Sequence, residues 1–262
     1  MLLLVGYAYD IFNLGFSPWE LEGRAFPDYT FYSAVFNYAA GTYGGVVGGN
    51  YGSFGGRMKF FTSGNMDMTD EEGNVVGSFT SNFVSLGGLY GTTFKGFSVR
   101  GGLSLLYVSL SPQSRGIALG LLGDARRRFP KEWGHWDVWA TLDGLGYEVV
   151  PAGLYRTLTS FRAYAGAGVK FHRLISYLQA AYYYVGGPAL MLGAGLDYGL
   201  LRVLVGYDSH YSDLYGGYGR DRLAGTYFSF SLSYNRFHFS YAYNPMGLLG
   251  DRHILGVAYD LR

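Results

Sequence analysis

Residues 226–244 read TYFSFSLSYNRFHFSYAYN, and this stretch decides the fold. On each side of the dipeptide Asn235-Arg236, every second residue is large and apolar, while the residues between are mostly small or polar. Side chains of a β-strand alternate between two faces, so each half predicts a strand with one apolar and one polar face. The short break predicts a tight turn that joins the two strands as an antiparallel hairpin.

The same alternation recurs along nearly the whole chain, with aromatic residues kept toward the ends of the runs. A soluble sheet alternates too, but this recurrence is typical of a transmembrane β-barrel, whose apolar face meets lipid and whose other face meets water. The candidate strands lie near residues 1–12, 29–40, 44–54, 56–68, 80–94, 97–111, 115–123, 135–145, 158–172, 174–185, 189–200, 201–211, 222–235, 236–244 and 252–261. Bacterial barrels of this type have an even number of strands, so we predict an all-β fold, an antiparallel up-and-down barrel of about 14 strands. It forms a single domain over residues 1–262 and lies in the bacterial outer membrane.

Composition agrees with this prediction and excludes several other classes of protein. Gly at 42 and Tyr at 26 of 262 residues are far above average usage, which suits bent strands and an interfacial aromatic girdle. The net charge of +1 gives no electrostatic reason to expect nucleic acid as a partner. The absence of cysteine excludes disulfides and thiolate metal sites. The start, Met1 to Ala8, has no basic region, so we expect a first strand there in preference to a signal peptide.

The alternation also assigns side chains to the two faces of the barrel. The residues expected to face lipid are Leu103, Leu105, Leu192, Leu196, Val203, Val205, Phe230, Leu232, Phe239 and Val257. The residues expected in the interfacial girdle are Tyr107, Tyr198, Tyr207, Tyr234, Tyr243 and Tyr259. Segment 174–185 is apolar on both faces, and its facing stays open. Substitution by arginine should strongly destabilise the barrel in the bilayer at the outward Val203 or Leu232. The same substitution at the inward Gly206 or Ser231 should destabilise it less if the lumen is roomy.

Inward positions carry charges of both signs. The candidate lumen-lining residues are Arg100, Asp137, Asp143, Arg162, Lys170, Asp197, Arg202, Asp208 and Asp260. They are either ion pairs that satisfy one another across strands or the lining of an aqueous pore, and the sequence does not separate the two.

Long connections are expected at 13–28, 66–79, 124–134, 146–157 and 211–221, and short hairpin turns elsewhere, as at residues 112–114. Outer-membrane barrels point their long loops outward. The candidate docking residues in these loops are Tyr211, Tyr215, Tyr218, Arg126, Arg127 and Arg128. The three arginines could hold anionic headgroups or lipopolysaccharide phosphates, or form a solvated loop with Asp124 and Glu132 as partners. The acidic residues of 65–74 could hold Ca²⁺, but their spacing fits no EF-hand and favours a solvated loop.

No motif in the chain points to catalysis or to a cofactor. The five histidines are scattered singly, with no spacing that places two on one metal. The chain has no Gly-x-Ser-x-Gly elbow, phosphate loop or dinucleotide fingerprint. A barrel enzyme would need a serine, a histidine and a carboxylate on inward positions, and nothing in the sequence singles out such a cluster. We therefore predict that the chain is not an enzyme and needs no cofactor.

Several short motifs, taken in order, resemble the PorV/PorQ group of outer-membrane barrels, distant relatives of the FadL fatty-acid transporters. They are Thr69-Asp70-Glu71-Glu72-Gly73 with Gly77-Ser78-Phe79, Gly116-Ile117-Ala118-Leu119-Gly120-Leu121-Leu122, Leu142-Asp143-Gly144-Leu145-Gly146, and the close from Phe239 through Asn244-Pro245-Met246-Gly247 to His253. The family's Asn-Pro-Ala-Gly element is not in this chain, and Leu261-Arg262 replaces the usual terminal aromatic residue. The resemblance implies a fourteen-stranded barrel that serves as an accessory protein, in some members within secretion systems.

Three functional hypotheses follow. The first is a scaffold barrel that docks other envelope or secreted proteins through its long loops, with lipid or lipopolysaccharide around it. The alternative is a channel or FadL-like conduit for small or hydrophobic solutes across the outer membrane. The third, a soluble β-sandwich, would have to bury every apolar face between sheets.

Overall fold

The structure is a computed structural model, and it describes residues 29–38, 41–70, 72–111, 113–152, 161–184, 187–209, 215–216, 219–220, 223, 225–245 and 251–262. The expected strand at 1–12 and the expected connection at 13–28 lie outside these residues. Among the described residues, no helix has the length and apolar character needed to cross a membrane.

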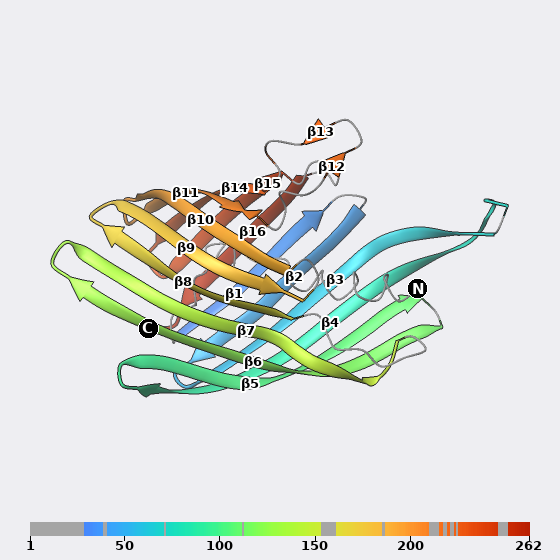
Figure 1. The fold of residues 1–262 in the computed structure, drawn as a ribbon, viewed down its shortest axis with the longest axis horizontal. Coiled ribbons are helices and arrows are strands. Elements are labelled where there is room, and N and C mark those ends of the chain that lie inside the picture. Colours follow the sequence, from blue (N-terminus) through green and yellow to red (C-terminus); the bar gives the residue numbers. More distant parts are fainter. Residues whose placement is uncertain are drawn as a thin grey trace.

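Fourteen antiparallel strands close into one barrel in the order β1-β16-β15-β14-β11-β10-β9-β8-β7-β6-β5-β4-β3-β2 (Figure 1). Their bounds are β1 Tyr29–Tyr38, β2 Thr42–Tyr51, β3 Phe54–Thr69, β4 Val75–Phe94, β5 Phe97–Ser111, β6 Ser114–Lys131, β7 Gly134–Val150, β8 Arg162–Phe171, β9 Leu174–Tyr183, β10 Gly187–Asp197, β11 Leu201–Asp208, β14 Thr226–Tyr234, β15 Phe237–Pro245 and β16 Asp251–Asp260. The last strand closes on the first with Thr30 opposite Asp260 and Asn37 opposite His253. The predicted fold class and strand number are confirmed. The β-sandwich hypothesis is wrong, because the fourteen strands form one closed sheet and not two sheets packed face to face.

The outer face is apolar and exposed, as the alternation predicted. All ten residues assigned to the lipid face are exposed large hydrophobic side chains, from Leu103 at 64% to Leu196 at 38%. The girdle tyrosines divide evenly between the two ends of the barrel: Tyr107, Tyr207 and Tyr243 at one end, and Tyr198, Tyr234 and Tyr259 at the other. Two girdles of aromatic residues, one at each end, with a band of aliphatic side chains between them are the expected outer surface of a membrane barrel.

The ambiguous segment 174–185 is resolved by the barrel. In β9, the side chains of Leu174, Leu178 and Tyr182 are exposed outward, whereas Gln179 and Tyr183 are buried inside. Gln179 Oε1 accepts a hydrogen bond of 2.8 Å from Trp139 Nε1 on β7. Apolar residues lie on both faces here because this part of the lumen is itself partly apolar.

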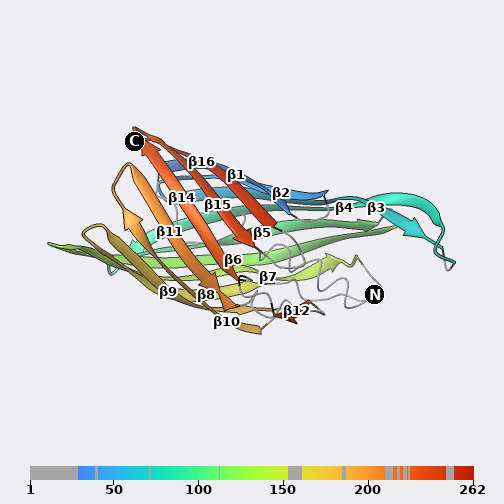
Figure 2. The same ribbon diagram turned by 90° about the horizontal axis from the view of Figure 1, so that it is seen from above.

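The two ends of the barrel differ in their connections, which the views in Figures 1 and 2 show at opposite ends of the molecule. One end has only short turns, at residues 52–53, 95–96, 132–133, 172–173, 198–200 and 235–236, and also the end of β16. Three of these turns place a non-glycine residue at positive φ, Lys95 at 48°, His172 at 52° and Asn235 at 53°, as two-residue hairpins of the right twist require. The other end has the longer connections, including 209–225 with the small hairpin of β12 (Tyr215–Gly216) and β13 (Gly219–Arg220). Short turns are periplasmic in barrels of this kind, so we orient the longer connections outward.

Three expected long connections are wrong in extent. Residues 124–134 are the end of β6, a two-residue turn and the start of β7, and β7 continues to Val150 inside the expected 146–157 loop. The charged residues that suggested a loop in fact alternate between the lumen and the outer face, and a lumen accepts charge. The connection expected at 66–79 shrinks to 70–74, and the short 112–113 turn lies at the end with the longer loops.

The β3–β4 hairpin extends beyond the rest of the barrel wall (Figures 1 and 2). Pairing of β2 with β3 ends at Thr62, and pairing of β4 with β5 begins at Asn82, so residues 65–69 and 75–80 pair only with each other. A register shift between Thr62 and Asn65 marks the point where this ribbon leaves the wall. Bulges commonly end regular pairing at barrel rims.

Candidate functional site: the barrel lumen

Apolar side chains pack together inside the lumen, alongside buried polar and charged ones such as Glu148, Arg162 and Arg252. A cluster of fifteen buried residues joins eleven of the strands, among them Tyr32, Phe36, Phe61, Phe83 and Tyr227. The rings of Phe36, Phe61 and Phe83 follow one another across β1, β3 and β4, with centroids 6.3 and 5.9 Å apart. This lumen therefore contains packed apolar side chains, whereas the interior of a water-filled porin is polar.

Inward tyrosines lie over inward glycines on the neighbouring strand. Tyr177 is the direct register partner of Gly193, and Tyr227 is that of Gly206. A Cβ atom on either glycine would overlap the tyrosine ring. The high glycine and tyrosine content thus serves interior packing as well as the outer girdle. The lumen therefore has no room for an arginine at Gly206. It has none at Ser231 either, because that side chain is only 6% exposed.

Two of the predicted lumen residues, Arg100 and Asp137, each form an ion pair with a residue of opposite charge on an adjacent strand. Arg100 Nε lies 3.0 Å from Asp124 on β6, and Asp137 Oδ1 accepts a 2.8 Å hydrogen bond from Arg128 Nε. Asp124 is therefore a partner of Arg100 and not of the 126–128 arginines. In both pairs the two residues are direct register partners, so strand register alone brings them together.

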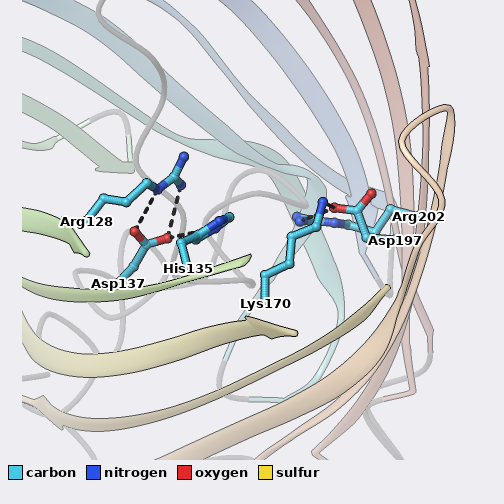
Figure 3. Close-up of polar contacts among 6 residues, drawn as sticks. All are labelled: Arg128, His135, Asp137, Lys170, Asp197 and Arg202. Carbon is cyan, nitrogen blue, oxygen red and sulfur yellow. Dashed lines mark hydrogen bonds and ion pairs between the residues drawn. The ribbon is translucent and has the colours of Figure 1, made fainter. Parts of the chain in front are cut away.

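Three more predicted residues form one cluster. Lys170 on β8 and Arg202 on β11 both lie 3.0 Å from Asp197 Oδ2 on β10 (Figure 3). Figure 3 shows this cluster facing the Arg128–Asp137 pair, with His135 between them. Both groups face inward, as the alternation assigned Asp137, Lys170, Asp197 and Arg202, whereas Arg128 was expected in a docking loop.

One predicted carboxylate makes contacts across the interior. Asp143 on β7 accepts hydrogen bonds from Arg57 and, at 2.9 Å, from Lys59, both on β3. β3 and β7 are separated by three strands in the wall, so these contacts cross the lumen. Arg57 and Lys59 were missed in the sequence, because nothing local distinguishes them from solvated strand cations.

The remaining predicted residues divide between the two ends. Arg162 and Asp208 are buried toward the outward end, at 5% and 4% exposure. Asp208 Oδ2 accepts a hydrogen bond from the Tyr183 hydroxyl at 3.3 Å. Asp260 lies at the periplasmic end, where Thr30 Oγ1 donates to its Oδ1 at 3.1 Å.

A cavity of about 640 Å³ occupies the periplasmic end of the lumen. Its charged lining includes Arg126, Arg128, Lys170 and Arg202 on the cationic side, and Asp137 and Asp260 on the anionic side. The side chains of Lys170, Asp137 and Asp260 are each about 30% exposed although they point into the barrel. Charged groups with this exposure inside the wall indicate that the cavity is open to water.

Two residues that line this cavity, His238 and Asp260, belong to a side-chain trio with Ser233 that the sequence did not reveal. Ser233 on β14 is the register partner of His238 on β15, and its Oγ lies 2.9 Å from His238 Nδ1. His238 Nε2 lies 2.9 Å from Asp260 Oδ2 on β16. The signal was present in the hairpin, since a turn at 235–236 pairs 233 with 238, but the alignment of Asp260 depends on the β15–β16 register.

The predicted docking residues are placed differently from expectation. Tyr211 and Tyr218 lie outside the described residues, and Tyr215 is in β12. Arg126, Arg127 and Arg128 are part of β6 near its periplasmic end, not of a loop. All three contribute to the lining of the cavity, and the Arg127 guanidinium lies over the rings of Phe97 and Phe129, at 5.3 and 4.7 Å.

The acidic loop is closed by its own side chains. Asp70 Oδ1 accepts hydrogen bonds from the backbone N–H groups of Glu72 and Asn74, at 3.0 and 2.8 Å. These bonds favour the charged form, so they hold the pKa of the exposed Asp70 carboxyl below its ordinary value of 3.8. No cluster of metal-ligating side chains occurs in the part of the chain that the structure describes.

Comparison with solved structures finds other barrels at low sequence identity. A KdgM porin is 10% identical, over 89% of this chain and 99% of its own, with a TM-score of 0.43. The P. putida toluene transporter TodX is 9% identical, over 94% and 93%, with a TM-score of 0.46. Acinetobacter baumannii Omp33 is 7% identical, over 89% and 98%, with a TM-score of 0.44. No family model matches the chain, and no curated protein matches its sequence. At these identities the likeness concerns the fold.

With its even strand number, closed wall and apolar outer face, the chain is an integral β-barrel of the bacterial outer membrane.

Proposed function

We propose that this barrel is a conduit for small solutes across the outer membrane. The observation that carries the proposal is the water-accessible cavity at the periplasmic end, lined by charged side chains from strands far apart in the wall. A barrel that served only as a rigid scaffold would gain nothing from partly exposed charges in its interior, since packed apolar side chains fill a small barrel at lower desolvation cost.

The lumen supports a particular solute class. Beyond the cavity, the aromatic residues Phe36, Phe61 and Phe83 pack against one another inside the barrel and are only 1–4% exposed, so a passing solute has to displace them. A solute that meets charged groups first and aromatic groups next would be small and partly apolar. We therefore propose small amphipathic solutes, and not simple salts, as the transported class.

Two measurements test the conduit. The purified, detergent-extracted protein is inserted in a planar lipid bilayer, and proteoliposomes are assayed for swelling in small sugars and in small aromatic acids. Stable conductance steps with faster entry of the aromatic acids are expected. Silent insertion together with no solute entry would overturn the proposal.

A scaffold role is the second candidate, and the projecting β3–β4 ribbon supports it. Residues 65–69 and 75–80 pair with each other and with no further strand of the barrel wall. The side chains of Val75 and Val76 on this ribbon are more than 60% exposed. We propose that a scaffold function, as in the PorV/PorQ group whose motifs this chain resembles, would use this ribbon together with Tyr211, Tyr215 and Tyr218 to dock envelope or secreted proteins. Crosslinking in intact cells, with and without residues 66–78, tests it: loss of every crosslinked species with the shortened hairpin is expected, and an unchanged pattern would contradict it.

A further inference from the structure

Ser233, His238 and Asp260 stand in line on the inner faces of β14, β15 and β16. The Ser233 Oγ to His238 Nδ1 distance and the His238 Nε2 to Asp260 Oδ2 distance are both 2.9 Å. A nucleophile within hydrogen-bond reach of a base, which is itself oriented by a carboxylate, is the geometric signature of a serine hydrolase site. We propose that this trio is a hydrolytic site for small carboxylic esters, facing the periplasmic cavity.

The hydrogen bonds determine where the imidazole proton lies. An ionised Asp260 can only accept, so His238 Nε2 must carry the proton that it donates to Oδ2. In the neutral ring, Nδ1 then has a free lone pair, which accepts the hydroxyl proton of Ser233. Thr30 Oγ1 donates to the other Asp260 oxygen at 3.1 Å and fixes the carboxylate. The trio is thus held in the tautomer that a general base requires.

The base and the carboxylate of the site face the cavity, and Ser233 is half-buried beside them. The side chains of His238 and Asp260 are 29% and 31% exposed, and both line the 640 Å³ cavity. A cavity of this size lies within the usual range of about 300–1,000 Å³ for small-molecule sites. Ser231, two residues along the same strand and on the same face, is buried, and its hydroxyl has no hydrogen-bond partner among the described residues. The two serines are therefore chemically different positions on one strand.

The reaction uses only the ester and water. Ser233 Oγ attacks the ester carbonyl carbon, the hydroxyl proton passes to His238 Nδ1, and the carbonyl π electrons move to oxygen as an oxyanion. When the tetrahedral intermediate collapses, the bond to the leaving alkoxide breaks and the alkoxide takes the proton from Nδ1. Water then attacks the acyl-serine by the same route, which releases the carboxylic acid and restores the Ser233 hydroxyl.

The cavity also supplies positive charge for the oxyanion and the substrate. Lys170 and Arg202 line it and share the single carboxylate of Asp197, so the three groups keep one net positive charge. Arg202 is the register partner of Ser231, one inward position from Ser233. Fixed cations in a partly closed site stabilise charge that develops in the transition state. Trp139, Ile175 and Leu204 add an apolar lining. The substrate class is therefore a small ester with an apolar acyl group and a negative charge.

The test uses the purified full chain in detergent micelles, with a fluorophosphonate probe and the anionic chromogenic ester 4-nitro-3-(butanoyloxy)benzoic acid. Labelling of the wild type at Ser233, located by peptide mass spectrometry, is expected. Ser233→Ala should abolish the labelling and lower kcat by at least about 100-fold, as should His238→Gln. Ser231→Ala is the matched control and should leave kcat within about twofold, since Ser231 has no base beside it. Heat-dependent gel mobility checks that each variant is a folded barrel.

Asp260 acts through His238, so it is a positioning residue with its own readout. Asp260→Asn should lower kcat while KM stays unchanged, because the carboxylate orients the base and does not contact the ester. The neutral 2-nitrophenyl butyrate should show a higher KM than the anionic ester; equal KM values would overturn the assigned substrate class. An unlabelled wild type, or hydrolysis that persists in a folded Ser233→Ala variant, would overturn the site itself and leave the conduit proposal untouched.

Discussion

The ring of Tyr227 on β14 covers Gly206 on β11, its direct partner in the strand register. The ring is 1% exposed and belongs to the apolar cluster of the lumen. Cross-strand pairs of this kind are a main source of sheet stability, and here the glycine is required by the space that the tyrosine occupies.

Substituting this glycine should therefore destabilise the barrel. Gly206→Ala would place a Cβ inside the Tyr227 ring, and we expect a loss of about 1–3 kcal/mol in the free energy of unfolding, as overpacking typically costs. Urea unfolding in lipid vesicles measures it. Gly88→Ala, where a Cβ meets nothing within 4 Å, is the control. Tyr227→Ala in the Gly206→Ala background should make the alanine neutral; a penalty that remains would show that the ring is not its cause.

Arginine should distinguish the lipid face from the cavity. Val203→Arg and Leu232→Arg place a charge on the outer face near the strand centres and should cost about 2–4 kcal/mol. Thr93 lines the periplasmic cavity, so Thr93→Arg should cost less than about 1 kcal/mol. Vesicle-based unfolding of the three variants checks the assignment. Equal losses at all three positions would mean that the outer face does not meet lipid.

The Asp143 contacts should control both stability and ion preference. Asp143→Asn leaves Arg57 and Lys59 without their carboxylate, and removal of one partner from a buried ion pair typically costs about 3–5 kcal/mol. In a conducting barrel, the added positive charge should also move the reversal potential in a KCl gradient toward that of chloride. Asp137→Asn is the control for stability, because its partner Arg128 is 63% exposed and such pairs contribute less than about 1 kcal/mol. An unchanged reversal potential in a folded, conducting Asp143→Asn variant would place Asp143 outside the ion path.

Acid should open the 70–74 turn. The pKa of Asp70 is lowered by its hydrogen bonds to Asn74 and Glu72, so the charged carboxylate stabilises the turn at pH values above about 4. That stabilisation disappears as the pH falls through the lowered pKa. Hydrogen exchange at the amides of Glu72 and Asn74 should show less protection at pH 2 than at pH 6, after correction for intrinsic rates. Asp70→Asn should lose the pH dependence, and a wild type without it would show that the carboxylate does not hold the turn.

The sequence by itself determined the barrel, because alternation is a local property of an extended chain. The stretch 226–244 already contains two strands, their facing and the turn between them. Lipid and water impose opposite demands on the two faces, so period-two alternation gives the outward position of Val203 and the inward position of Arg202 without any knowledge of neighbours.

Only the tertiary structure decided which inward residues meet. The contacts of Asp143 with β3 depend on barrel closure and tilt, which bring together strands separated by three others in the wall. Asp260 reaches His238 only through the register of β15 with β16, although a hairpin turn already sets Ser233 opposite His238. The sequence does not reveal whether a charged side chain in the lumen pairs with a neighbouring strand, pairs with a strand across the barrel or is solvated by water. The barrel is encoded locally, whereas its interior chemistry depends on distances between strands that the chain order does not contain.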